Sequence, residues 1–271
     1  MIDTRLFSAS DYEWEIQFKF RLDALHKVFR SITHSTIDKK PVKEWQRFVN
    51  LQEGSLYLSC FNLTVGYGYE YVGNCGRLVI TPLTERAQRS IVLALKHRYG
   101  SALEGPFGTG KTETVKDLSK TLARSIHVIN TSSQIDYVEI LKFFKGVTSS
   151  GAWVLFDELN RLEVPMMNFM TQIISQIQNA LRAHTSYIMV EESKIAIDSE
   201  SAIFITLNPG YAGRKDLPNS LRSLFRPISM VVPDMDLIVE IMLSQAGFYQ
   251  AYDLSKKMCH FQKQAGEILR T

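Results

Sequence analysis

The sequence predicts an α/β fold in which a parallel sheet is flanked by helices. From Arg77 onward, short apolar runs such as residues 152–156 and 202–207 alternate with segments of helical periodicity. Strands that are apolar along their whole length are typical of a parallel sheet covered by helices on both faces. With 271 residues, of which 45% are apolar and 22% charged, the chain is long enough to bury such a core without disulfides.

The first 66 residues follow a different pattern. Apolar residues recur at helical spacing between Trp14 and Phe29, which predicts a helix. Residues 56–58 and 63–65 predict two short strands. We therefore expect a small helical and β segment at residues 1–66, ahead of the α/β domain.

Residues 67–232 are expected to form the α/β domain, and residues 233–271 the beginning of a helical domain. Thr84 is expected to cap a helix that stops at Gly100, and a later helix is expected to end at Gly146. The other predicted helices cover residues 111–124, 165–182, 237–245 and 251–268. The predicted strands cover residues 101–104, 126–130, 152–156, 187–190, 194–197, 202–207 and 228–232.

Composition and charge exclude several classes of protein. The formal net charge is 31 − 28 = +3, which does not fit a protein built to coat nucleic acid. No apolar run is long enough to span a bilayer. The three cysteines form no CxxC pair of the kind that zinc sites use. We expect neither a nucleic acid nor a membrane as partner.

A glycine-rich, phosphate-binding turn is predicted between a strand and a helix. It matches the pattern G-x-x-x-x-G-K-[ST] at every position, through Gly105, Pro106, Phe107, Gly108, Thr109, Gly110, Lys111 and Thr112. The glycines let backbone N–H groups point inward toward an anion. Lys111 supplies a positive charge to the outer phosphates, and Thr112 supplies a hydroxyl ligand for Mg²⁺. A chance glycine-rich turn is the alternative, and the flanking strand and helix disfavour it.

A pair of carboxylates ends the apolar strand at residues 152–156. Ligands of open α/β sheets bind at the carboxyl ends of the strands. Asp157 is therefore expected to face the Mg²⁺ that Thr112 holds, and Glu158 to orient or deprotonate a water beside the terminal phosphate. On its own, the pair is equally well interpreted as a solvated loop, and the phosphate-binding turn favours the catalytic interpretation.

A polar residue also ends the strand at residues 202–207. Asn208 is placed to hydrogen-bond the attacking water or the terminal phosphate of a nucleotide. An asparagine before Pro209 is also a common turn residue, and spacing alone favours that alternative.

Taken together, these segments resemble the first AAA+ module of dynein heavy chains, a P-loop ATPase family. The resemblance covers the chain from about Tyr67 to its end. Phe107 stands where the family usually has Ala, and Leu159 where it usually has Phe. The helix near Trp14 resembles the last part of the linker that precedes the dynein ring. The motifs that carry the resemblance are residues 69–74, 77–84, 105–117, 156–161, 206–214, 217–219 and 224–227.

The resemblance implies the hydrolysis of Mg-ATP to ADP, coupled to linker movement in a microtubule motor. It implies that Asn208 senses the γ-phosphate and that Arg226 occupies an arginine-finger position, which acts on a neighbouring module. It adds Glu113 to the nucleotide-binding turn. It also places four apolar residues against the adenine: Leu78, Val79, Pro82 and Leu83.

The partners implied are the other AAA+ modules of a dynein ring. Intermediate chains, light chains and microtubules are implied only through the full-length heavy chain, in the cytoplasm and cytoskeleton or in the axoneme of a cilium. Because such a motor needs six modules, 271 residues are expected to be a fragment or a truncated product, with weak hydrolysis by itself. The alternatives are an inactive fragment and a stand-alone P-loop nucleotide switch, which tends to lose the carboxylate that Glu158 provides.

Overall fold

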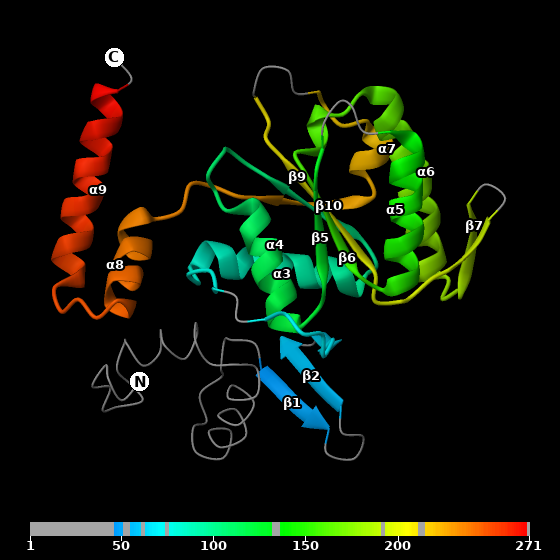
Figure 1. The fold of residues 1–271 in the computed structure, drawn as a ribbon, viewed down its shortest axis with the longest axis horizontal. Helices are drawn as coiled ribbons and strands as arrows, with labels where there is room; N and C mark the ends of the chain where they lie inside the picture. Colours follow the sequence, from blue (N-terminus) through cyan, green and yellow to red (C-terminus); the bar gives the residue numbers. More distant parts are fainter. Residues whose placement is uncertain are drawn as a thin grey trace.

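The computed structural model describes residues 46–50, 55–60, 63–73, 76–131, 136–190, 193–210 and 215–269. Figure 1 shows three parts: a small sheet of blue strands, a central body of sheet and helices, and two C-terminal helices in orange and red. The predicted helix between Trp14 and Phe29 lies outside the described residues.

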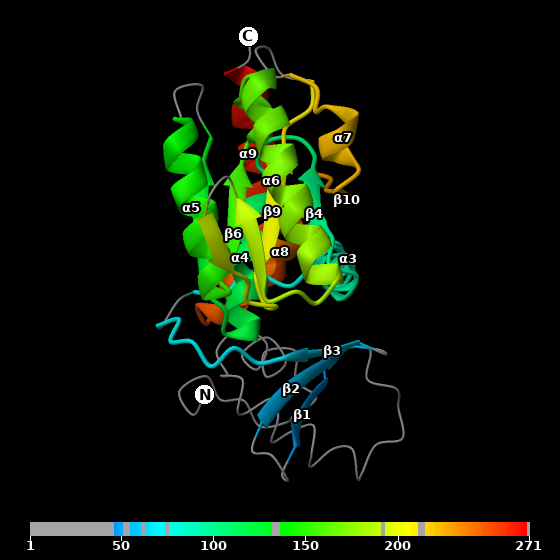
Figure 2. The same ribbon diagram turned by 90° about the vertical axis from the view of Figure 1, so that its right-hand side faces the viewer.

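The small sheet contains three antiparallel strands in the order β1-β2-β3. Strands β2 (Ser55–Cys60) and β3 (Leu63–Gly66) confirm the two strands predicted there, whereas β1 (Gln46–Asn50) was not predicted. Figure 2 shows this sheet at the end of the central body where the chain enters it.

The central sheet has five strands in the order β10-β4-β9-β6-β5, and every neighbouring pair is parallel. The predicted parallel sheet is therefore confirmed. Because the strands are parallel, their carboxyl ends meet at one edge, where ligands of open α/β sheets bind. The strands are β4 (Gly100–Glu104), β5 (Ile126–Asn130), β6 (Trp153–Asp157), β9 (Ala202–Leu207) and β10 (Phe225–Ser229).

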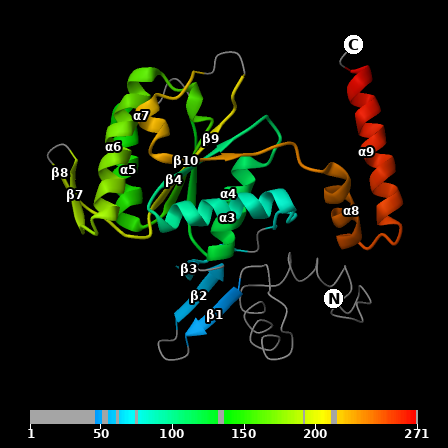
Figure 3. The ribbon, with the colours of Figure 1, turned by 180° about the vertical axis from the view of Figure 1, so that it is seen from behind.

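Helices cover both faces of this sheet, as the uniformly apolar strands predict. One face packs against α3 (Pro82–Lys96) and α4 (Lys111–Leu122), and the other against α5 (Tyr137–Ser150) and α6 (Val164–Arg182). Figure 3 shows α3 lying across α4. Smaller elements complete the body: the 3-10 turn η2 (Leu159–Arg161), α7 (Asn219–Arg222), and a hairpin of β7 (Tyr187–Val190) and β8 (Ser193–Ala196).

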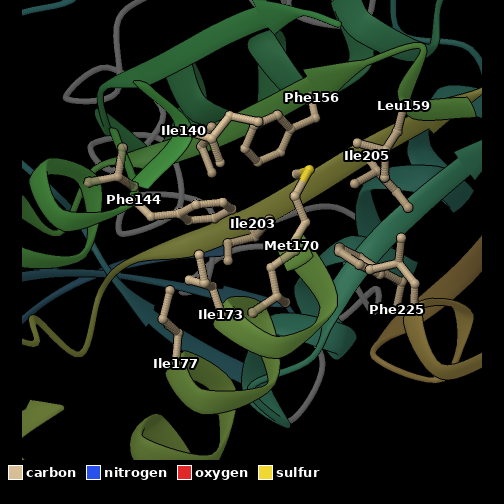
Figure 4. Close-up of a cluster of buried hydrophobic side chains, with 14 of the residues drawn as sticks. Ile140, Phe144, Phe156, Leu159, Met170, Ile173, Ile177, Ile203, Ile205 and Phe225 are labelled. Atoms are coloured by element: carbon tan, nitrogen blue, oxygen red, sulfur yellow. The ribbon is translucent and has the colours of Figure 1, made fainter. Parts of the chain in front are cut away.

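Alternate residues of each central strand enter opposite cores. Phe156 and Ile205 join the core beneath α5 and α6, whereas Leu155 and Phe204 join the core beneath α3 and α4. Figure 4 shows the first of these cores, in which Phe144, Phe156 and Met170 lie close together. Successive side chains of a strand point to opposite faces, so these pairs fix the orientation of the last residues of β6 and β9.

The predicted end of α3 at Gly100 was wrong, because the helix ends at Lys96 and Gly100 begins β4. Three further predicted boundaries were also wrong. Helix α3 begins at Pro82, and its N-cap is Thr81, which forms a capping box with Thr84: the predicted cap is therefore the third residue of the helix. Helix α5 continues through Gly146 and ends before Gly151, which adopts φ 72°. Packing outweighs the weak helix propensity of glycine there, since the next two residues of the helix, Val147 and Thr148, are buried.

The third boundary is that of β10, predicted at residues 228–232 and found three residues earlier. Its ladder with β4 begins at the pair Phe225–Gly100. A Cβ on Gly100 would lie 2.4 Å from the ring of Phe225, so the absent side chain of this glycine makes room for the ring. Val231 and Val232, which suggested a strand, are exposed after it ends.

Two C-terminal helices, α8 (Met235–Gln245) and α9 (Ala251–Ile268), match the two helices predicted there and pack against each other. Buried positions are few in this pair, and they include Ile241 and Cys259. In the part of the chain that the structure describes, the helices lack the combined length and apolar character that crossing a bilayer requires.

We expect Phe204→Ala to lower the free energy of unfolding by about 3–5 kcal/mol. The side chain is fully buried on β9, and its ring centroid lies 5.0 Å from that of Trp153. Urea unfolding followed by tryptophan fluorescence measures the loss. Val232→Ala, at a position that is 67% exposed, is the control and should change stability by less than about 0.5 kcal/mol. A similar small change for both variants would contradict the packing described.

Candidate nucleotide-binding site

The predicted phosphate-binding turn joins β4 to α4. Gly108 and Gly110 have φ angles of 74° and 79°, in the left-handed region where other residues are strained. Gly105 is required for a different reason, because a Cβ there would lie 2.1 Å from the carbonyl oxygen of Met230. The turn is therefore held close to the residue that follows β10.

Lys111, the first residue of α4, is buried and folds back over the turn. Its Nζ donates to the carbonyl oxygens of Gly105 at 3.0 Å and Pro106 at 2.6 Å. Thr109 is also buried and donates from its hydroxyl to the carbonyl of Pro106 at 3.0 Å. Burial lowers the pKa of the Lys111 ammonium, and the nearby carboxylates of Asp157 and Glu158 partly oppose that shift.

Asp157 lies at the carboxyl end of β6 and faces Thr112, as predicted. Its Oδ1 accepts from the hydroxyl of Thr112 at 2.7 Å and from the hydroxyl of Thr206 at 2.6 Å. The two donors come from α4 and β9. The carboxylate therefore connects the helix after the phosphate-binding turn to two neighbouring strands of the sheet.

Glu158 follows with left-handed backbone angles, φ 56° and ψ 46°. A non-glycine residue in this region costs on the order of 1 kcal/mol or more, and surrounding contacts must hold it there. Its N–H donates to the hydroxyl of Thr206 at 2.9 Å, and its carbonyl accepts from the hydroxyl of Thr131 at 2.7 Å. This conformation turns the carboxylate of Glu158 away from the path of the strand.

The carboxylate of Glu158 is held by two side chains. Oε1 accepts from Nδ2 of Asn208 at 2.8 Å, and Oε2 pairs with Nε of Arg161 at 2.5 Å. Asn208 is buried, and its backbone carbonyl accepts from Nδ2 of Asn160 at 3.1 Å. Its own Oδ1 is buried and has no hydrogen-bond partner among the residues that the structure describes, which is rare for a buried polar atom.

One cavity of about 220 Å³ lies at the carboxyl edge of the sheet, lined by residues of the phosphate-binding turn together with Asp157, Glu158 and Asn208. Phe107, Gly108 and Glu113 are its exposed members, and Glu113 also pairs with Lys116 at 2.7 Å. Each lining residue is one that the sequence predicted for the site: Phe107, Gly108, Gly110, Lys111, Thr112, Glu113, Asp157, Glu158 and Asn208.

Of the predicted site residues, Gly105, Pro106 and Thr109 belong to the turn without lining this cavity, and five others lie outside both the turn and the cavity. Leu78 and Val79 lie before α3, and Pro82 and Leu83 form its first two residues. Arg226 lies exposed on the edge strand β10, where it pairs with Ser101 of β4. Because it lies three residues before the carboxyl end of that strand, it is about 10 Å from the edge where the cavity opens.

Four residues that support the site were not predicted to do so: Thr131, Asn160, Arg161 and Thr206. Thr206 is a hydroxyl residue in an otherwise apolar strand, and Thr131 directly follows β5. A polar residue at or just past the end of a buried strand is a pattern from which both threonines could have been predicted as site residues. The contact of Arg161 depends on η2, a turn that the sequence pattern did not indicate.

The residues present fit Mg²⁺ bound together with phosphate. Among the described residues, no three or more His, Cys, Asp or Glu side chains are grouped to hold a metal ion. The hydroxyl of Thr112 and the carboxylate of Asp157 offer oxygen ligands of the kind that Mg²⁺ prefers. Mg²⁺ is commonly held by one or two carboxylates and by substrate phosphates, so a site with few protein ligands is sufficient for this metal.

A phosphate-binding turn, two carboxylates and a polar strand end on a parallel sheet define a P-loop nucleotide-binding domain of the AAA+ type. The model of one protein family, described as the hydrolytic ATP binding site of dynein motor region, matches residues 67–271. The chain belongs to this family and is an ATP-binding, ATP-hydrolysing module.

The similar proteins found by sequence comparison are dynein heavy chains, which is consistent with this family. The chain is 40% identical over 269 residues to mouse dynein axonemal heavy chain 1, covering 99% of this chain and 6% of that protein. It is 46% identical over 218 residues to the dynein-1-alpha heavy chain of the flagellar inner arm I1 complex of Chlamydomonas reinhardtii, covering 80% of this chain and 5% of that protein. The chain thus spans only a small part of the relatives it matches.

A solved structure of a protein from Cytophaga hutchinsonii is distantly similar. It aligns with a TM-score of 0.44 and 16% identity, over 64% of this chain and 54% of its own.

We expect the affinity for ATP to fall as the pH rises through the alkaline range below the ordinary pKa of a lysine. Phosphate binds the protonated form of Lys111, whose pKa is lowered by burial in the free site. The contribution of its charge is therefore complete below that lowered pKa and is lost as the pH rises through it. Titration with a fluorescent ATP analogue at a series of pH values measures the decline.

Lys111→Met should bind ATP at least about tenfold more weakly, since a hydrogen bond to a charged group contributes about 1.5–3 kcal/mol. It should also show no decline over this pH range. Lys142→Met removes an exposed lysine of α5 and should keep both the affinity and the decline of the parent chain. A decline of equal slope in Lys111→Met would show that another group titrates.

Proposed function

We propose that this chain is the ATP-hydrolysing first module of a dynein heavy chain, in which Mg-ATP turnover is coupled to movement of a preceding linker. In this proposal, residues 1–66 belong to the linker, residues 67–232 form the large nucleotide-binding domain, and residues 233–271 begin the helical lid. The family match over residues 67–271 supports the second and third of these assignments together.

The observation that carries the proposal is the position of Glu158. Its carboxylate contacts Asn208 at 2.8 Å and lines the same cavity as Lys111 and the pair of Thr112 and Asp157. A site that only binds nucleotide needs the turn, the lysine and a metal ligand. A second carboxylate, held in a strained backbone conformation beside them, is what a hydrolytic site requires in addition.

The proposed roles follow from these contacts. Lys111 exchanges its contacts with the backbone carbonyls of Gly105 and Pro106 for the outer phosphates. Thr112 and Asp157 hold Mg²⁺, which when bound neutralises part of the phosphate charge. Glu158 orients the attacking water and takes up its proton.

Asn208 has two polar groups to offer in this scheme. Its Nδ2 contacts the oxygen of Glu158, while its buried Oδ1 has no protein partner among the described residues. A side chain between the proposed base and the terminal phosphate is suited to sense that phosphate, which is the role we propose for it. The same contact argues against a residue that only terminates a turn.

Two further assignments rest on the resemblance to the family. We assign Leu78, Val79, Pro82 and Leu83 to the adenine site; of these, Leu78, Val79 and Leu83 are half-buried. We assign Arg226 to an arginine finger that acts on a neighbouring module. Its exposed position on an edge strand, away from the cavity of its own chain, supports an action in trans.

The names of the relatives extend the proposal to the place of action. The relatives named above are axonemal and flagellar dyneins, which supports an axoneme of a cilium or flagellum as the location. The other modules of the ring, the associated chains and microtubules are the partners of the complete heavy chain in this proposal. A stand-alone nucleotide switch is the competing function, and the presence of Glu158 disfavours it.

Two isosteric substitutions test the assignment of the two carboxylates. Glu158→Gln keeps the shape of the side chain and removes the base, so ATP binding should persist while hydrolysis slows by roughly 10²–10⁴. Asp157→Asn removes a charged oxygen ligand, so Mg²⁺-dependent affinity should fall instead. Single-turnover hydrolysis and ATP titrations with and without Mg²⁺ measure both effects.

Glu163→Gln is the matched control, because this exposed carboxylate at the start of α6 makes no cap hydrogen bond. It should leave hydrolysis and affinity at the parental values. Parental hydrolysis by Glu158→Gln would remove this residue from the reaction and would mean that another group activates the water. An unchanged Mg²⁺ dependence in Asp157→Asn would remove the metal assignment.

A further inference from the structure

A buried carboxylate, Asp117, lies on α4, outside the cavity described above. Asp117 is 3% exposed and uses both of its oxygens as acceptors. Oδ1 accepts from Nε of Arg77 at 2.7 Å and from the backbone N–H of Leu78 at 3.1 Å. Oδ2 accepts from Nε2 of Gln88 at 3.2 Å and from Arg77 at 3.3 Å. Burial of a carboxylate is unfavourable unless it is paired in this way.

The partners of Asp117 come from two places. Gln88 belongs to α3, whereas Arg77 and Leu78 belong to the extended segment before that helix. Arg77 also donates to the hydroxyl of Thr121 at 2.6 Å, one turn after Asp117. The guanidinium therefore lies along α4, and the carboxylate ties three segments together.

The segment that begins at Gly76 runs antiparallel to α4. Lys120 donates to the carbonyl of Gly76 at 3.1 Å, while Asp117, earlier in the helix, holds Arg77 and Leu78. Between Gly76 and Leu78 the chain thus runs toward the beginning of α4, where phosphate is proposed to bind. Asp117 lies six residues after Lys111, which corresponds to about 9 Å along the helix axis.

Through the contact of its N–H with Asp117, Leu78 is held at a fixed distance from the phosphate-binding turn, and Val79 follows it directly. Both are half-buried, so each leaves part of its apolar side chain exposed. A purine base has apolar faces, which apolar side chains can contact, whereas the phosphates require the turn itself. The distance between these two contacts must match the length of a nucleotide.

We propose that Asp117 is a positioning residue for the base: it fixes Leu78 and Val79 relative to the phosphate-binding turn and so sets the preference for a nucleotide over phosphate alone. This inference rests on the proposed nucleotide site. It assigns no contact with ATP to Asp117 itself. Its effect is carried by Arg77 and by the backbone N–H of Leu78.

Asp117→Asn tests this inference. The amide keeps one acceptor oxygen, but its NH₂ group faces donors from Arg77 or Gln88 and cannot accept from them. The segment that carries Arg77 and Leu78 should therefore shift. Calorimetric titrations with Mg-ATP and with inorganic tripolyphosphate, which has no base, separate the two parts of the site. Affinity for ATP should fall about tenfold, which corresponds to about 1.4 kcal/mol. Affinity for tripolyphosphate should stay within about twofold of the parent chain, a difference of about 0.4 kcal/mol.

Arg77→Lys is the second variant, in case Asp117→Asn does not fold. It keeps the positive charge and loses the two-pronged contact with the carboxylate, so it should show the same selective loss to a smaller extent. Glu85→Gln is the control, because it makes the same chemical change in an ion pair with Arg89 on α3. It should leave both affinities unchanged.

The outcomes separate this inference from the proposed function. If the parent chain binds ATP no more tightly than tripolyphosphate, there is no base contact to position and the inference is wrong, although the phosphate site stands. Equal losses for both ligands in the variants would mean a merely structural role, and unchanged ATP affinity in folded Asp117→Asn would also overturn it. If Lys111→Met binds both ligands like the parent chain, the proposed function itself fails.

Discussion

The hydroxyl of Thr206 holds both carboxylates of the site in place. It donates to Asp157 at 2.6 Å and accepts from the N–H of Glu158 at 2.9 Å. Thr206 is fully buried on β9, and the carboxylates belong to the last residue of the neighbouring strand β6 and to the residue after it. The geometry of the site therefore depends on the register between these strands, which pairs Phe156 with Ile205. A slip of one residue would turn Thr206 to the opposite face of the sheet.

The phosphate-binding turn depends on the same strand from its other side. In the register between β4 and β9, Glu104 pairs with Leu207, and the next N–H, that of Gly105, donates to the carbonyl of Leu207 at 3.2 Å. Because β9 lies between β4 and β6, it sets the position of the turn and of the carboxylates together. The core on both faces keeps this strand in place, through Phe204 on one face and Ile205 on the other.

The residues that would contact the nucleotide, metal or water were predicted from the sequence better than the residues that hydrogen-bond to them and fix their position. Glycine, lysine and threonine at the turn follow from the demands of a phosphate, and Asp157 and Glu158 follow from those of a metal and a water. Thr131 escaped prediction because its partner, Glu158, is distant in the chain and is reached only through the strand register. Arg161 is only three residues from Glu158, but the two meet because of the turn η2, which the sequence pattern did not indicate. Helix ends were predicted less well for a related reason, since packing carries α5 through Gly146 against its local propensity.

Helix α4 is the element through which the parts of the described chain meet. Its first residues bind the turn, and Asp117 in its middle holds the segment before α3. At its far end, the carbonyls of Leu122 and Ala123 accept from the N–H groups of Gly68 at 2.8 Å and Glu70 at 3.1 Å.

The approach of the chain at that far end requires a glycine. A Cβ on Gly68 would lie 2.3 Å from the carbonyl oxygen of Ala123, so a larger residue would push the segment away from the helix. Arg124 adds a contact with the carbonyl of Gly66 in β3 at 3.2 Å and an ion pair with Glu200 at 2.7 Å. An α-helix is stiff over this length. The segment that follows β3 is therefore fixed to the same rigid helix as the phosphate-binding turn.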